Sequence, residues 1–188
     1  MKRFIKILPI CLLTIFTGCI VTSIHPLYTE DVTIFDTNLI GEWIGENEDG
    51  GPVFIQYGEK KYKMFLKEEK DTLQFEVHLV KLQEDLFLDL YPLYSGKDDE
   101  TFGGIHFLAL HSIFFVKQIE PTLQLAPLSQ QWLKDQIKND PTCIAHEIVR
   151  DRIILTASSK DFQKFVINHV QTQGAFDAVD TFTHKNNP

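Results

Sequence analysis

Cys19 is the residue whose position most clearly indicates chemistry, because a thiolate is a strong nucleophile and this cysteine follows an apolar segment. The chain opens with a basic head that carries Lys2, Arg3 and Lys6, and an uncharged apolar stretch follows from residue 7 to 16. That stretch is too short to cross a hydrocarbon core of about 30 Å. A basic head, a short apolar core and small residues before a cut site are typical of a secretory signal peptide.

The run Phe16-Thr17-Gly18-Cys19 resembles the lipobox of bacterial lipoproteins. Gly18 and Cys19 match the pattern, Thr17 is acceptable, and Phe16 replaces the commonest Leu. The resemblance implies that residues 1–18 are a lipoprotein signal peptide, cut between Gly18 and Cys19, and that the Cys19 thiol takes up a diacylglyceryl group and palmitate-type chains. Each buried CH₂ of such chains contributes about 0.8 kcal/mol, so release from the membrane would be negligible.

The residue after the cysteine bears on the address. In the lipoprotein pattern an Asp at that position can hold the protein at the inner membrane, and here it is Ile20. The resemblance therefore implies a lipid-anchored protein of the cell envelope, with the outer membrane favoured if the cell is Gram-negative.

Other side chains that could do chemistry lie within apolar segments: His78, Asp89, His106, His111 and His146. Five residues separate His106 from His111, so a strand would place them on opposite faces, which disfavours a shared metal. His146-Glu147 is not continued as a zinc-protease motif, because position 150 is Arg. Asp89 fits an alternating strand on its solvent face. We expect these groups to be structural or exposed.

Motifs for nucleophilic catalysis are absent from the sequence. It has no Gly-x-Ser-x-Gly and no Ser-x-x-Lys with partners, and Gly103-Gly104 is too short for a phosphate loop. We therefore predict no catalytic residue, metal or cofactor, and no enzymatic activity. Cys143 would be the only thiol left in the mature chain, and we interpret it as an apolar filler that cannot form an internal disulfide.

The charge excludes one class of partner. The chain carries a formal charge of −8, and removal of Lys2, Arg3 and Lys6 with the signal would leave −11. Because proteins bind nucleic acid by neutralising phosphates with Lys and Arg, we expect no nucleic-acid partner. The same charge argues against a protein that lies flat on anionic lipid.

After the signal we expect a lipidated tether and a packed segment over residues 19–38, then a single β-rich domain over 39–188. Period-two alternation and short turns between 40 and 92 predict an antiparallel meander, with a bulge where the alternation slips at Leu79-Val80. A polar loop at 95–104 precedes further strands. Short helices are expected near 129–138 and 159–170, with a strand pair between them. The fold class is therefore mainly β with two C-terminal helices (α+β).

Gly41-Glu42-Trp43 at the head of this meander resembles the Gly-x-Trp start of lipocalin-like barrels, which implies a barrel or half-barrel with Trp43 closing one end. The run from His25 to Asp31 together with Gly41-x-Trp43 also looks like a group of uncharacterised bacterial lipoproteins. That second resemblance implies an address and a fold, without an activity.

Two hypotheses of function follow. The strand count and the 15 Phe favour an envelope lipoprotein whose barrel binds a small apolar ligand. The alternative is a structural or interaction module that docks on another envelope protein through the loop at 95–104 or the helix that carries Trp132.

Overall fold

The computed structural model describes residues 20–46, 50–67, 71–93 and 108–185. The predicted signal peptide (residues 1–18), Cys19, the predicted loop at 95–104 and His106 lie outside these ranges. In chain order the elements are β1 (Thr22–Ser23), β2 (Thr33–Ile34), η1 (Thr37–Leu39), β3 (Gly41–Gly45), β4 (Pro52–Gln56), β5 (Tyr62–Lys67), β6 (Thr72–Leu82), β7 (Asp85–Pro92), β8 (His111–Gln118), β9 (Thr122–Pro127), α1 (Gln130–Asn139), β10 (His146–Val149), β11 (Arg152–Leu155), α2 (Ser159–His169) and β12 (Asp180–His184).

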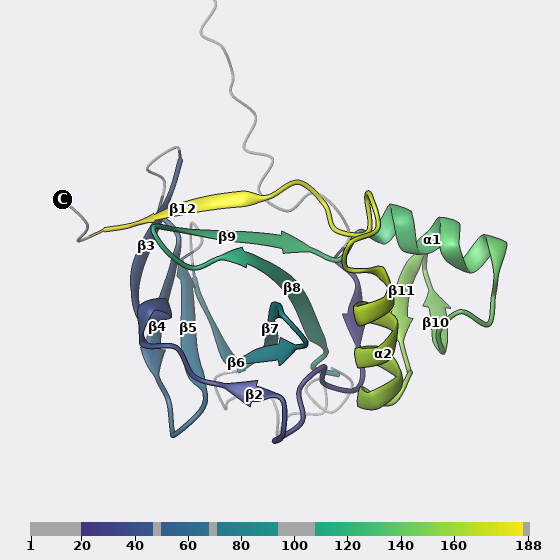
Figure 1. Cartoon of the computed structure of the whole chain (residues 1–188), viewed down its shortest axis with the longest axis horizontal. Coiled ribbons are helices and arrows are strands. Elements are labelled where there is room, and N and C mark those ends of the chain that lie inside the picture. Colours follow the sequence, from purple (N-terminus) through teal and green to yellow (C-terminus); the bar gives the residue numbers. More distant parts are fainter. Residues whose placement is uncertain (1–19, 47–49, 68–70, 94–107, 186–188) are drawn as a thin grey trace, which may run out of the picture.

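Eight of the described strands, β3 to β9 and β12, form a closed antiparallel barrel (Figure 1). Strands β3 to β9 pair in sequence order, which confirms the predicted meander. Strand β12 then pairs with both β3 and β9, with Phe182 opposite Gly45 and Leu123. The mainly β prediction is confirmed as a full barrel. The closing strand β12 was not predicted, because its sequence Asp-Thr-Phe-Thr-His has a single apolar side chain.

The barrel interior is filled with side chains. Fourteen inward-facing hydrophobic residues form one cluster, and each is no more than 8 % exposed: Leu39, Trp43, Phe54, Tyr62, Met64, Val77, Leu79, Leu88, Leu90, Phe114, Val116, Ile119, Leu123 and Leu125. Twelve of them come from the wall strands, all of which contribute except β12, whose Phe182 packs at the edge of the same cluster; Leu39 lies in η1 and Ile119 between β8 and β9. Such an interior resembles the side-chain-filled core that eight strands can close around.

A second core lies on the outer face of β6, β7 and β8. The sheet continues from β8 through β1 and β11 to β10, and α1 and α2 pack on this extension (Figure 1). The buried side chains here include Val80, Phe87, Ile113, Leu133 and Phe162. Strands of this wall are therefore covered on both faces.

The N-terminal segment belongs to this second core. Strand β1 lies between β8 and β11, Val21 and Ser23 are 2 % exposed, and Leu27 is fully buried. Within residues 19–38, where a tether and an entry segment were expected, Thr22 and Ser23 form strand β1 of the sheet. The expected packing of the following segment is observed.

Two local predictions have opposite outcomes. Both helices occur close to their predicted ranges, and Ser129 and Ser158 cap them by accepting backbone N–H groups of Trp132 and Asp161. The prediction of a bulge at Leu79-Val80 is wrong, because β6 pairs with β7 without a register shift. Leu79 faces the barrel interior and Val80 faces the outer core, so the break in alternation reflects burial on both faces.

Candidate functional site

Asp89 is the centre of a buried polar cluster on the outer face of the barrel wall. The residue is 0 % exposed. Its Oδ1 lies 2.6 Å from Nδ1 of His111, and its Oδ2 accepts the backbone N–H of Leu27 at 2.5 Å. The carboxylate therefore joins β7, β8 and the N-terminal segment. The prediction that Asp89 faces solvent is wrong, because the N-terminal segment covers that face.

His78 lies directly opposite Asp89 on β6 and continues the cluster. Its ring stacks on Tyr28, with ring centroids 3.7 Å apart, and its Nε2 lies 3.0 Å from Glu76 Oε1. Glu76 in turn accepts a hydrogen bond from Lys61 Nζ at 2.8 Å. The chain of contacts Lys61–Glu76–His78–Tyr28 thus runs from the residue before β5, across β6, to the N-terminal segment.

The other ring nitrogen of His78, Nδ1, is buried. Among the described residues this buried Nδ1 has no hydrogen-bond partner. A buried polar atom without a hydrogen-bond partner costs free energy.

Two pKa shifts reflect the electrostatics of the cluster. Burial, with the charges of Asp89, Glu76 and Tyr91, raises the pKa of Tyr28. Burial also acts to raise the pKa of Glu76, but hydrogen bonds and charge from Lys61 and His78 outweigh it, so the pKa of Glu76 is lowered. The ionised form of Glu76 is therefore the one that the fold stabilises.

An Asp–His pair is a familiar acid–base arrangement, yet here both carboxylate oxygens are occupied by the fold. The nearest serines are poor nucleophile candidates. Ser23 Oγ donates to the His25 carbonyl at 2.6 Å, and Ser112 follows His111 in β8, so its side chain is on the other face. The arrangement is suited to clamping the N-terminal segment onto the barrel wall.

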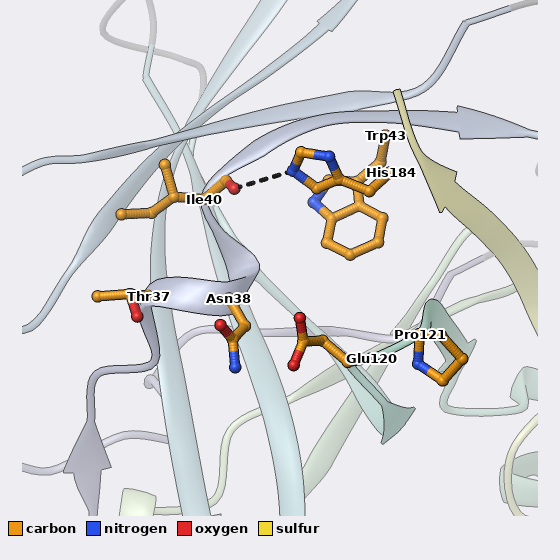
Figure 2. A pocket seen from close by; sticks show the side chains of 7 residues that line it. All are labelled: Thr37, Asn38, Ile40, Trp43, Glu120, Pro121 and His184. Atoms are coloured by element: carbon orange, nitrogen blue, oxygen red, sulfur yellow. Dashed lines mark hydrogen bonds between the residues drawn. The ribbon is translucent and has the colours of Figure 1, made fainter. Parts of the chain in front are cut away.

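A second feature lies at the barrel end that Trp43 closes. A cavity of about 260 Å³ is lined by Thr37, Asn38, Ile40, Trp43, Glu120, Pro121 and His184 (Figure 2). Trp43 is 1 % exposed and donates its indole N–H to the Leu39 carbonyl at 3.0 Å. Most of the cavity's lining is polar, with the Asn38 and Glu120 side chains beside the rings of Trp43 and His184.

The structure explains the glycine of Gly41-x-Trp43. Gly41 has φ +139°, and the His184 ring lies against it, so that an added Cβ would be 2.1 Å from His184 Nε2. That ring meets Trp43 edge-on at 5.0 Å between centroids. The motif therefore makes room for the last barrel strand, and Trp43 occupies the end position that the sequence predicts.

The candidates from the sequence are brought together in part. His78, Asp89 and His111 converge on one cluster. His146 lies apart on β10 and bonds locally to the Ile144 carbonyl. Cys143 is half-buried beside the outer core, and burial raises the pKa of its thiol, as expected for a packing residue. Trp132 packs on Phe165 and His169 within the same core.

Tyr28, Glu76 and Lys61 were missed. The apolar Leu27-Tyr28 pair in a polar segment was the available signal for Tyr28. Glu76 and Lys61 follow ordinary strand alternation, so nothing in the sequence distinguishes them from solvent-facing charges.

Comparison with protein-family models, curated proteins and solved structures finds no match for this chain. In the part of the chain that the structure describes, no group of three His, Cys, Asp or Glu side chains is placed to hold a metal ion. The same described residues contain no helix that is both long and apolar enough to span a membrane. The fold defines the class: a mainly β protein on a closed eight-stranded antiparallel barrel with two helices.

Proposed function

We propose that this protein is a lipoprotein of the cell envelope, anchored through acyl chains on Cys19, and that its barrel is a structural or interaction module held directly at the membrane surface. The observation that carries the proposal is the position of β1. Its first residue, Thr22, is three residues after Cys19 and is already paired with Ser112 and Ile154.

This short connection supports a fixed orientation. Consecutive Cα atoms are about 3.8 Å apart, so the three Cα–Cα steps from Cys19 to Thr22 span at most about 11 Å. Val21 is buried and Ile20 packs at the edge of the barrel core, which leaves little free chain between anchor and domain. A domain attached in this way presents one end to the membrane and the other to its partners.

The packing favours a module over a carrier of a small apolar ligand. A carrier needs an apolar cavity, whereas the inward-facing side chains of this barrel pack against one another. The cavity beside Trp43 is small and mostly polar. Native mass spectrometry of protein from its own host tests this choice, and a co-purified lipid would restore the carrier hypothesis.

The anchor is tested by a Cys19→Ala variant expressed in a bacterial host beside a Cys143→Ala control. We expect the control to incorporate labelled palmitate, to fractionate with membranes and to have an N-terminus at residue 19. Cys19→Ala should incorporate no label and stay uncleaved or be released. Normal membrane anchoring and mature mass in Cys19→Ala would overturn the proposal.

A further inference from the structure

The tip of the β10–β11 hairpin, residues 148–152, lies at the same end of the sheet as the start of the described chain. Strands β1 and β11 are parallel, with Thr22 opposite Ile154. Because the two strands are parallel, the residues that precede β1 and the turn that precedes β11 lie toward the same end of the sheet. Cys19 is one peptide bond before Ile20. An anchor at Cys19 would therefore hold this hairpin tip at the membrane surface.

The tip exposes apolar side chains on both of its faces. Ile148 is 60 % exposed and Val149 is 50 % exposed, among the largest exposures of hydrophobic residues in the described chain. Consecutive strand residues point to opposite faces, so the two side chains project on either side of the hairpin. Water is a poor environment for such a pair, and the boundary between headgroups and acyl chains is a good one.

The arginines of the sequence are concentrated at the same tip. Apart from Arg3 in the signal segment, Arg150 and Arg152 are the arginines of this chain. Both are exposed, and they flank Asp151, with Glu147 further along β10. Residues 148–152 carry a formal charge of +1, from two Arg and one Asp, whereas the whole chain carries −8. Guanidinium groups bind phosphate oxygens by paired hydrogen bonds.

The turn holds these groups in place. Val149 pairs with Arg152, and the two residues between them, Arg150 and Asp151, have φ of 50° and 66°. A two-residue turn with both φ positive is the tight hairpin form, which usually has Asn or Gly at these positions. Arginine at the first of them is unusual.

We infer that the tip at residues 148–152 contacts the membrane beside the anchor, with Ile148 and Val149 entering the interface and Arg150 and Arg152 binding phosphates of anionic phospholipid. This inference rests on the proposed anchor at Cys19. The acidic body keeps the rest of the domain away from an anionic surface, so the barrel stands on this end.

The test uses the full chain, expressed in bacteria, purified from membranes and reconstituted in vesicles of phosphatidylcholine and phosphatidylglycerol. A Val149→Cys variant in a Cys143→Ala background is labelled with an environment-sensitive fluorophore, and nitroxide-labelled lipid serves as the quencher. An Ile55→Cys variant, labelled at an exposed position of β4, is the control. We expect at least threefold stronger quenching at position 149 than at position 55.

A second pair of variants tests the charges. Arg150→Asn with Arg152→Gln should lower the ratio of inserted to free hairpin about 25-fold, since each arginine near an anionic surface contributes about fivefold. Lys60→Gln with Lys67→Gln removes the same charge from exposed positions, one in the turn before β5 and one at its last residue, and should change the ratio less than twofold. Circular dichroism confirms that each variant is folded.

The two proposals fail separately. An acylated N-terminus at Cys19, seen by intact mass, with a water-exposed label at position 149 would overturn the hairpin contact alone. Equal effects of the arginine and lysine pairs would also overturn it. A chain that carries no acyl group would overturn the anchor and the inference built on it.

Discussion

Asp89 offers the most direct test of how the N-terminal segment is held. An Asp89→Ala variant removes the acceptor for two buried donors, the Leu27 backbone N–H and Nδ1 of His111. Each buried donor left without a partner costs about 1–3 kcal/mol. The two donors together would cost about 2–6 kcal/mol. We therefore expect the free energy of unfolding to fall by this amount.

An Asp89→Asn variant refines this test. The amide has nearly the same shape, but only one of its two terminal atoms is an acceptor, so it can serve Leu27 or His111 and not both. We expect a loss of about 1–3 kcal/mol. Asp71→Ala is the control, because its carboxylate is exposed and should matter by less than about 0.5 kcal/mol.

Urea denaturation measures the three free energies, and amide hydrogen exchange locates the effect. Exchange of the Leu27 N–H should accelerate in Asp89→Ala, while exchange within β4 and β5 should change only with global stability. A cost below about 1 kcal/mol for Asp89→Ala, or unchanged protection at Leu27, would refute the clamp.

Three further predictions concern other parts of the fold. Gly41→Ala should destabilise the barrel by about 1–3 kcal/mol, because the new Cβ would meet the His184 ring and φ is positive. Thermal unfolding measures the change, and a fall in Tm no larger than that of an exposed-site control would contradict the prediction. Burial raises the pKa of Tyr62 to about 12, so this tyrosine ionises in the unfolded chain at a lower pH than in the folded protein. The free energy of unfolding should therefore fall by about 2–3 kcal/mol between pH 10 and 12. A Tyr62→Phe variant should remove this loss. Because the pKa of Glu76 is lowered, its ionised carboxylate stabilises the fold above pH 4.5, and this stabilisation is lost as the pH falls through the folded-state pKa. A Lys61→Met variant should show a higher Glu76 pKa by carboxyl NMR titration. An unchanged pKa would exclude the ion pair as a cause.

The barrel was predictable because its strands are local. Period-two alternation and short turns define β3 to β9 one hairpin at a time, and Gly41-x-Trp43 predicts which residue closes an end. Strands β1 and β12 were not predictable in this way. Thr22–Ser23 is too short to show a period, and β12 is specified by its contacts with β3 and β9 rather than by its own composition.

The error at Asp89 has a physical cause in the same wall. Alternation predicts the direction of the side chain correctly: Asp89 points away from the barrel interior, as His78 does across the sheet. Alternation carries no information about what covers the outer face. The neighbouring run Phe87 to Leu90 is buried throughout, and a strand buried on both faces reads as a nearly continuous apolar stretch. A carboxylate inside such a stretch must have partners, since an unpaired buried charge is too costly to keep. Asp89 was therefore a signal that another segment covers this wall, and the buried Leu27 shows which segment it is.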